Sequence, residues 1–471
     1  MKMNQKSELL KNTIIIALGK LGTQIVSFLL LPLYTQKLTT DEFGTYDFLV
    51  TLSVFILPII TLLIEESMFR FLIDAENEKD KKRIITSAII CMLIGTIIFS
   101  IIASIIISIT HYQYGILFLI FVISNILVIL SNSLSRGMGK IKTYSVSNFV
   151  LGVLTIVLNI LFIVSFKMQA DGLLWANTLA NTITALIVLY TLKFHKFISR
   201  KTLSIKRLKE MISYSLPLVP NNLSWIIISL SDRLMLTWMV GADENGIYSI
   251  ANRFPNIIYT CYGFFSTAWK ESAAKIIKEK NKTEYYNGIY KDMKAFLKAI
   301  TIGLIAVMPF AFPILIKPAY NSAYAFIPIL AIGIYYTNMS NFYGGIFTAF
   351  KNTKIMGSTT VIGAILNVSI NLIFMKMFPE NGILIATLST LISTLVVYIY
   401  RRARLREYIK LREKFNVRYW LLLILVLAAY YTNNKVFCAA ILIVVVIYCY
   451  ITNKEFLEST LSSIKAKLRK R

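Results

Sequence analysis

Residues 84–110 read IITSAIICMLIGTIIFSIIASIIISIT and contain no charged side chain. A helix needs about 20 mostly apolar residues to cross the hydrocarbon core of a bilayer, so this stretch predicts a transmembrane helix. Short polar loops separate it from thirteen further apolar stretches. The fourteen predicted spans are 12–35, 45–68, 84–110, 114–135, 143–166, 172–192, 212–239, 246–269, 294–316, 322–349, 356–376, 381–400, 418–432 and 436–452.

Composition and charge agree with a membrane protein. Hydrophobic residues make up 56% of the chain, its mean hydropathy is +0.65, and its net charge is +26. Most Lys and Arg residues fall in alternate loops, which places both termini in the cytoplasm. Because this charge is spread over many loops, it favours the lipid bilayer with its anionic headgroups as partner and argues against nucleic acid.

Two echoes within the sequence predict an internal duplication. The motif D-E-x-G-x-Y occurs at Asp41–Tyr46 and at Asp243–Tyr248, and Asn159 with Gly172 corresponds to Asn371 with Gly382. Six spans separate the copies, so both halves have the same orientation, as in transporters with parallel repeats. The predicted fold is an all-α integral membrane protein, with fourteen transmembrane helices in two pseudo-symmetric lobes around a central cavity.

The predicted domains follow from this repeat. Residues 1–192 form the N-terminal lobe, 193–211 a basic cytoplasmic linker, 212–400 the C-terminal lobe, and 401–471 a basic loop, two further spans and a cytoplasmic tail. In the repeated motif we expect each glycine to permit a sharp turn, the acids to favour a helix N-terminus, and each tyrosine to lie at the membrane interface.

Polar and basic residues inside spans are the candidates for substrate binding, because such groups are costly in lipid. Lys20 lies far from both ends of the first span, and we favour a position lining a cavity over a buried structural ion pair. Pro217 and Pro220 should distort the seventh span. Arg253 could bind a ligand or snorkel to the outer surface, and Lys298 is expected to snorkel. The predicted substrate-binding residues are Lys20, Gln24, Asn222, Arg233, Arg253 and Asn256.

A second set of ionisable residues is predicted to act in coupling or gating. Asp47, Thr51, Pro58, Thr61 and Glu65 form one stripe of the second span, and Glu66 can pair with Arg70 four residues later. Asp232 or its neighbour Arg233 could pair with Arg253 or Asp47. The predicted coupling or gating residues are Asp47, Glu65, Glu66, Arg70 and Asp232.

Several functions are disfavoured by what the sequence contains. The four cysteines and two histidines show no metal-site or disulfide spacing, and no cofactor is predicted. No nucleotide-binding loop of the G-x-x-x-x-G-K-[ST] type occurs. The predicted outer loops are too short for the catalytic domain of a glycan polymerase or ligase, so an enzyme is not expected. The deep basic groups favour an anionic cargo, since Lys and Arg suit phosphates.

The sequence also resembles a known family. Lys20-Leu21-Gly22, Leu31–Tyr34, the stretch LTTDEFGTYD at Leu38–Asp47, IEESMFRFL at Ile64–Leu72 and SDRLMLTWMVGADENGIYSIANRF at Ser231–Phe254 are similar to polysaccharide-repeat-unit flippases of the Wzx type. These flippases belong to the multidrug/oligosaccharidyl-lipid/polysaccharide exporter superfamily. The likeness covers essentially the whole chain.

This resemblance implies a function. A flippase of this type moves an undecaprenyl-pyrophosphate-linked oligosaccharide across the bacterial inner membrane for surface polysaccharide assembly, with polysaccharide polymerase machinery as a further partner. By position, Lys20 and Arg253 would hold the pyrophosphate. Two alternatives stay open, a drug or cation antiporter of the same superfamily and a flippase for a lipid-linked peptidoglycan precursor.

Overall fold

The computed structural model describes residues 30–197, 202–276, 279, 281–350, 352–412 and 416–469, without some of the side chains, among them those after Lys454. The regular elements of these residues are helices, and they form two compact units, Met1–Leu230 (unit 1) and Ser231–Arg471 (unit 2). The division falls inside one helix, α10 (Leu218–Met239).

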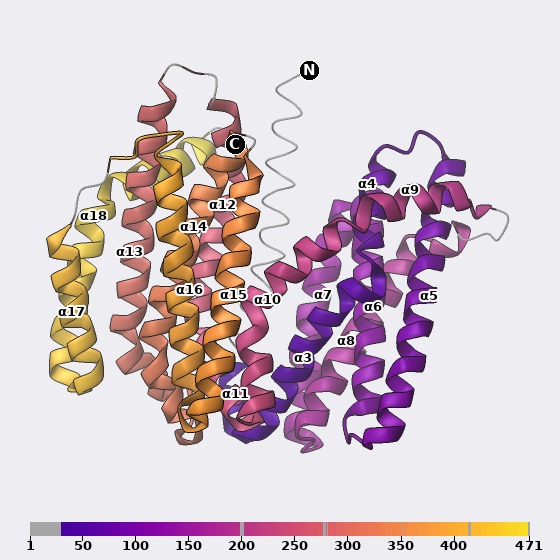
Figure 1. The fold of residues 1–471 in the computed structure, drawn as a ribbon, viewed down its shortest axis with the longest axis horizontal. Coiled ribbons are helices and arrows are strands. Elements are labelled where there is room, and N and C mark those ends of the chain that lie inside the picture. Colours follow the sequence, from indigo (N-terminus) through magenta and orange to yellow (C-terminus); the bar gives the residue numbers. More distant parts are fainter. Residues whose placement is uncertain are drawn as a thin grey trace. The chain divides into compact units, whose positions relative to one another are not determined.

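Unit 1 contains, before α10, a series of long helices and short connecting turns (Figure 1). Their bounds are α2 Leu31–Lys37, α3 Thr40–Thr61, α4 Ile64–Ile73, α5 Glu78–Thr110, α6 Gly115–Gly137, α7 Ile141–Ile160, η1 Leu161–Ser165, α8 Ala170–Thr191, η2 Phe194–Lys196 and α9 Ile205–Ser215.

Unit 2 continues from α10 and has the same character. Its elements are α11 Ala242–Arg253, α12 Pro255–Ile276, α13 Lys282–Leu315, η4 Pro318–Phe326, α14 Ile327–Ala349, α15 Thr353–Met377, η5 Pro379–Asn381, α16 Gly382–Leu405, α17 Val417–Thr432 and α18 Lys435–Arg469.

Nine helices in the described ranges are long and apolar enough to cross a membrane, and they coincide with predicted spans two to six, nine, eleven, twelve and fourteen. The shorter apolar helix α17 matches the thirteenth span, while α10, α11 with α12, and α14 occupy the seventh, eighth and tenth. Most of the first predicted span lies outside the described residues. An all-α multi-pass membrane protein is therefore confirmed, and the number fourteen stays a prediction.

Among the spans that the structure describes, three are interrupted. The second breaks between α3 and α4, where Leu62 and Leu63 adopt left-handed conformations with φ of 51° and 52°. The stripe predicted from Asp47 to Glu65 is therefore not continuous. The seventh is divided into α9 and α10 around Pro217, as predicted. The eighth is divided before Pro255, whose ring nitrogen has no hydrogen to donate to the preceding turn.

The repeated D-E-x-G-x-Y motif begins a helix in both units. Thr39 and Glu42 form a reciprocal capping box at the start of α3, and Asp243 lies in the first turn of α11, as expected for acids at helix N-termini. The glycines of the motif lie within these helices, so the predicted sharp turns are wrong. Tyr248 is 3% exposed and donates a hydrogen bond to Asp232, so its predicted place at the membrane interface is also wrong.

The helices of unit 1 pack around a core formed mainly by α4, α5 and α6 (Figure 1). Ile64, Met68, Ile85, Val122 and Leu134 are buried in this core, which α9 also covers. The opposite face of α5 exposes apolar side chains to the surroundings: Ile94, Ile98, Ile101, Ile105 and Ile109 each expose more than half of their surface. A helix that is apolar on both faces suits a lipid environment, because only one face needs protein contacts.

Gly95 marks a close approach of α5 to the broken end of α3. A Cβ added at Gly95 would overlap the backbone carbonyl oxygen of Ile60, which a rotamer change cannot relieve. We therefore expect Gly95→Ala to destabilise the purified protein by about 1–3 kcal/mol, the usual cost of overpacking. The midpoint of thermal unfolding in detergent measures this effect.

The matched control for this variant is Gly303→Ala in α13, where an added Cβ meets nothing within 4 Å. Alanine there should raise the unfolding midpoint slightly, since it favours a helix over glycine by about 1 kcal/mol. If both variants changed the midpoint in the same direction, the close approach at Gly95 would not limit packing.

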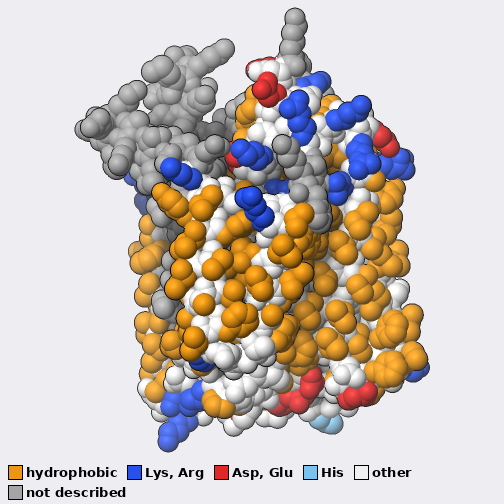
Figure 2. Space-filling model, turned by 90° about the vertical axis from the view of Figure 1, so that its left-hand side faces the viewer, with side chains coloured by type: hydrophobic (Ala, Val, Ile, Leu, Met, Phe, Trp, Pro, Cys, Tyr) orange, Lys and Arg blue, Asp and Glu red, His pale blue; other side chains and the backbone are white. Residues whose placement is uncertain are grey.

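In unit 2, α14 packs against α12 and α16, while α13 contacts α17 and α18 (Figure 1). Figure 2 shows the face on the α17 and α18 side, with hydrophobic side chains across its middle and most visible Lys and Arg side chains at one edge. Leu421 and Ile424 of α17 and Ile443, Val446 and Ile447 of α18 are each more than half exposed there. This arrangement matches a lipid-facing band beside a basic membrane boundary.

Candidate functional site

A buried carboxylate in unit 2 gathers neutral hydrogen-bond donors from three other helices. Asp232 of α10 is 3% exposed. Its Oδ1 accepts hydrogen bonds from Nδ2 of Asn367 at 3.0 Å and of Asn371 at 2.6 Å, both on α15. Its Oδ2 accepts from the Tyr248 hydroxyl at 2.8 Å and from the Thr390 hydroxyl of α16. The charge is thus stabilised by directed dipoles, and Asp232 has no ion pair within the described part of the chain.

Local sequence explains how these donors converge. Asn367 and Asn371 lie four residues apart on α15, so they share one helix face. Ser389 precedes Thr390 on α16 and donates a longer bond to Oδ1, at 3.4 Å. The Oδ1 of Asn367 accepts a hydrogen bond from Ser231, the residue before Asp232. The cluster therefore fixes α10, α15 and α16 to one another through polar side chains.

One oxygen in this cluster has no partner. The Oδ1 of Asn371 is buried and accepts no hydrogen bond from any described group. Such orphaned acceptors are rare in folded proteins, because each loses its interaction with water. Carboxylate, amide and hydroxyl oxygens together can hold a hard cation or exchange a proton. The Asp232 cluster is the strongest candidate for a coupling site among the described residues.

A second buried acid lies in unit 1, just after the break between α3 and α4. Glu65 is 5% exposed, and its Oε2 has no hydrogen-bond partner among the residues that the structure describes. Its neighbours Ile64 and Met68 belong to the apolar core. Leaving one carboxylate oxygen unpaired in such surroundings is costly, because it has lost its hydrogen bonds to water.

The other predicted coupling residues differ in their surroundings. Asp47 is buried in α3, at 6% exposure. Arg70 and Glu66 lie on the exposed surface of α4, and Arg70 pairs with Asp74 at 2.6 Å. The predicted pair between Glu66 and Arg70 is thus wrong, because Asp74 offers an equivalent four-residue spacing on the C-terminal side.

The predicted substrate-binding residues are placed as follows. Lys20 and Gln24 lie outside the described residues. Arg233 and Arg253 are partly buried, Asn222 is partly buried near the start of α10, and Asn256 is exposed on α12. The helix is interrupted at Phe254, so Arg253 is the last residue of α11 and Asn256 belongs to α12.

Sequence reasoning missed the neutral partners of Asp232. Asn371 and Tyr248 both occur in the internal repeats, where we interpreted them as structural markers. The corresponding Asn159 of unit 1 is fully buried and accepts a hydrogen bond from the Tyr34 hydroxyl at 3.3 Å. The repeat therefore contained a usable signal, because a polar residue repeated in the middle of apolar spans marks an equivalent buried position.

Lys298 and Arg401 are buried basic residues of unit 2. Lys298 is 7% exposed, with its Nζ 4.0 Å from the ring centroid of Tyr419, so it packs against an aromatic ring of the protein, and its snorkelling to the interface stays a prediction. Arg401 of α16, which the sequence analysis did not select, is 1% exposed. Its guanidinium donates to hydroxyls and carbonyls of α14 and α15.

Many helices that are long and apolar enough to cross a membrane, arranged in two helical units, define a multi-pass membrane protein. Comparison of the fold supports this class. The chain is similar to the lipid II flippase MurJ in an inward closed conformation, at 14% identity over 96% of this chain and 100% of that one, with a TM-score of 0.69. It is also similar to an inward-facing multidrug resistance MATE family transporter of the MOP superfamily, at 14% identity over 82% and 95% of the two chains, with a TM-score of 0.63.

Comparison of the sequence gives the family. Residues 9–269 match the family described as polysaccharide biosynthesis protein, so the chain belongs to that family. It is also 23% identical to the uncharacterized membrane protein MJ1375 of Methanocaldococcus jannaschii, over 61% of this chain and 71% of that protein. This family agrees with the resemblance to polysaccharide-repeat-unit flippases noted in the sequence, and the two solved structures share the fold of the chain. The protein is a multi-pass membrane protein of the polysaccharide biosynthesis family.

Proposed function

We propose that this protein is a flippase that moves an undecaprenyl-pyrophosphate-linked oligosaccharide repeat unit from the inner to the outer leaflet by alternating access, for surface polysaccharide biosynthesis. One observation carries the proposal: a chain of the polysaccharide biosynthesis family shares its fold, over 96% of its length, with a flippase for a lipid-linked substrate. In this proposal Lys20 and Arg253 hold the pyrophosphate, and Gln24, Asn222, Arg233 and Asn256 contact the sugars.

Electrostatics favours this direction of transport. With the cell interior negative, each negative charge moved outward gains about 2.3 kcal/mol per 100 mV of membrane potential. A pyrophosphate headgroup therefore moves downhill electrically. The buried carboxylates Asp232 and Glu65, together with Asp47, are proposed to couple this movement to a proton or a cation, because their protonation would change the balance of charge within each unit.

The proposed setting is the bacterial inner membrane, with both termini in the cytoplasm. The excess of Lys and Arg in alternate loops supports this orientation. Polysaccharide polymerase machinery is the proposed partner that would receive the translocated repeat unit.

A cation-coupled drug antiporter is the second candidate. The similarity in fold to a multidrug resistance MATE family transporter favours it, as do the buried carboxylates. Flippase activity on a lipid-linked peptidoglycan precursor is a variant of the first proposal and differs only in the glycan.

Reconstitution into liposomes distinguishes these functions. The assay offers a defined undecaprenyl-pyrophosphate oligosaccharide, lipid II and a cationic dye in separate vesicles, and a membrane-impermeant reagent reports which substrate reaches the opposite leaflet. We expect the oligosaccharide to move fastest. Transport of the dye alone would refute the flippase proposal. Movement of lipid II alone would mean that the protein acts in peptidoglycan synthesis instead.

In the same assay we expect Lys20→Ala and Arg253→Ala each to lower the flipping rate by about tenfold or more, since a hydrogen bond to a charged group contributes about 1.5–3 kcal/mol. Lys376→Ala, on an exposed position at the end of α15, is the matched control and should retain the wild-type rate. If all three variants inserted normally into the membrane and flipped the substrate at the same rate, Lys20 and Arg253 would not belong to the binding site.

A further inference from the structure

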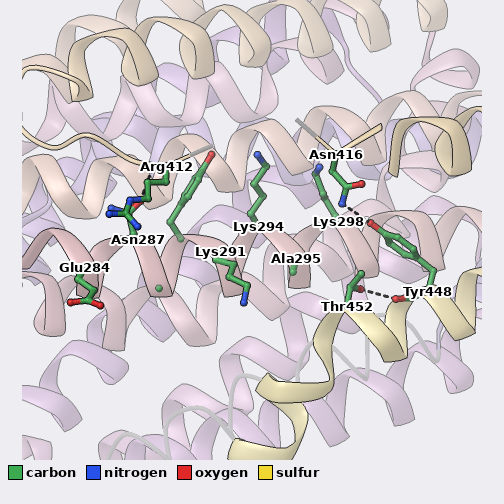
Figure 3. Close-up of a pocket in the computed structure, with 12 residues that line it drawn as sticks. Glu284, Asn287, Lys291, Lys294, Ala295, Lys298, Arg412, Asn416, Tyr448 and Thr452 are labelled. Atoms are coloured by element: carbon green, nitrogen blue, oxygen red, sulfur yellow. Dashed lines mark hydrogen bonds between the residues drawn. The ribbon is translucent and has the colours of Figure 1, made fainter. Parts of the chain in front are cut away.

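A basic groove lies in unit 2, away from the Asp232 cluster. It has a volume of 590 Å³ and is bounded by α13, by Arg412 and Asn416, and by α18 (Figure 3). This volume falls within the usual range of sites for small ligands. The lining residues used below are Glu284, Lys294, Lys298, Arg412, Asn416 and Tyr448.

Hydrogen bonds hold the walls of this groove in place. Asn287 of α13 accepts a bond from the backbone nitrogen of Arg412 at 2.5 Å and donates to the carbonyl of Lys410 at 3.3 Å. Asn416 caps the first turn of α17 through the Tyr419 nitrogen, at 3.1 Å, and donates to the Tyr448 hydroxyl of α18 at 3.3 Å. The groove is therefore a defined feature of the fold.

Two lysines give the groove its charge. Lys294 and Lys298 lie four residues apart, and Figure 3 shows them extending to the same side of α13, whereas Lys291 points to the other side. Lys298 lies against the rings of Tyr419 and Trp420, with its Nζ 4.0 and 5.9 Å from their centroids. In the described part of the chain no carboxylate pairs with Lys298, and the acid Glu284 lies at the far end of the groove in Figure 3. A buried ammonium held only by aromatic faces lacks an anionic partner.

The surroundings of the groove are those of a membrane boundary. Beyond Lys298, α13 is apolar up to Leu315. On α18, Val446, Ile447, Tyr450 and Ile451 expose more than half of their surfaces next to the groove residue Tyr448. A ligand with an anionic head and apolar chains could thus place its head over the lysines and its chains along α18.

We propose that this groove binds the phosphate headgroup of an anionic phospholipid of the inner leaflet. Lys294 and Lys298 would donate hydrogen bonds to the phosphate, and Arg412 would add charge at the aqueous end. This site differs from the proposed substrate site, since none of its residues is among those assigned to the oligosaccharide. A bound lipid would join α13 to α17 and α18 and stabilise this edge of the unit.

A structural lipid explains the groove better than a soluble anion does. A free phosphate would leave the adjoining apolar surface of α18 exposed to water, whereas acyl chains cover it. Juxtamembrane lysines attract anionic lipids by about 1 kcal/mol each, which makes binding selective among headgroups.

Fluorescence quenching in nanodiscs tests this proposal, because Trp420 lies beside Lys298. Discs of phosphatidylcholine receive increasing fractions of phosphatidylglycerol with brominated chains or, in parallel, brominated phosphatidylcholine. We expect greater quenching by the phosphatidylglycerol at equal fractions, and loss of this excess in Trp420→Phe. Equal quenching by both lipids would overturn the proposal.

The variants assign the effect to the groove. Lys294→Gln and Lys298→Gln should each weaken the apparent affinity for phosphatidylglycerol about fivefold, the equivalent of about 1 kcal/mol. Lys294→Arg should preserve binding, and so should Lys140→Gln, which removes an exposed lysine of unit 1. An unchanged affinity in Lys294→Gln would overturn the proposal even if Lys298→Gln failed to fold.

Competitors separate the possible sources of phosphate. If undecaprenyl pyrophosphate displaced phosphatidylglycerol at a much lower concentration, the groove would be a binding site for the transported lipid. Inorganic phosphate that displaces it equally well would indicate a site for free anions. Either outcome would overturn the assignment to a structural phospholipid. The assay measures no transport, so its failure leaves the proposed flippase function untouched.

Discussion

Asp232→Asn is expected to lower the flipping rate about 100-fold or more. The substitution replaces an acceptor oxygen with an amide group, which then faces the donors that now bind the carboxylate. Each charged hydrogen bond lost costs about 1.5–3 kcal/mol. The substitution also removes the negative charge that we propose to take part in coupling. The liposome flipping assay measures the rate, and the thermal unfolding midpoint measures the accompanying loss of stability.

Two further variants separate the charge from the hydrogen-bond network. Tyr248→Phe removes one donor and should destabilise the protein by about 1.5–3 kcal/mol, which lowers the unfolding midpoint. Flipping should stay within about tenfold of wild type, because the carboxylate charge that we propose to take part in coupling remains. Glu380→Gln neutralises an exposed acid in the same unit and should change neither quantity. If Tyr248→Phe impaired flipping as severely as Asp232→Asn, the cluster would be purely structural.

The fold class was accessible from sequence because long apolar stretches have few alternatives to membrane helices. Breaks caused by proline were equally accessible, as at Pro217. The break at Leu62 and Leu63 was not, since two leucines in left-handed conformations leave no compositional trace. Tertiary contacts decide this geometry, and the close packing of Gly95 against the end of α3 is one of them.

The candidate sites were only partly predictable, for a different reason. Asp232 and Glu65 stand out in sequence because charge in an apolar span is rare. Their surroundings do not stand out, because asparagine, serine, threonine and tyrosine are common in membrane helices. Lys298 was similarly recognisable as a lysine at the start of a span. Its aromatic partners lie more than a hundred residues later in the chain, and no local pattern connects them.

Arg401→Lys should destabilise the protein more than Arg401→Met does. The guanidinium donates to the hydroxyls of Thr359 at 2.9 Å and Thr360 at 2.8 Å and to the carbonyls of Ser340 at 3.1 Å and Met356 at 3.2 Å. Lysine keeps the buried charge but cannot reproduce this planar set of donors. It therefore retains the desolvation cost and loses the interactions that offset it, an expected loss of about 3–5 kcal/mol.

Methionine removes the charge together with its hydrogen bonds. The carbonyls of Ser340 and Met356 lie within α14 and α15, so each can still accept a hydrogen bond from its own helix. Replacing a buried charge by an apolar side chain of similar size is often nearly neutral, so Arg401→Met should cost less than about 2 kcal/mol. Arg404→Lys, on the exposed side of the same helix, should leave the unfolding midpoint unchanged, because its pair with Glu407 is accessible to water. If the methionine variant had a lower midpoint than the lysine variant, this expectation would be wrong. The positive charge at position 401 would then stabilise unit 2 by itself, without the planar set of hydrogen bonds.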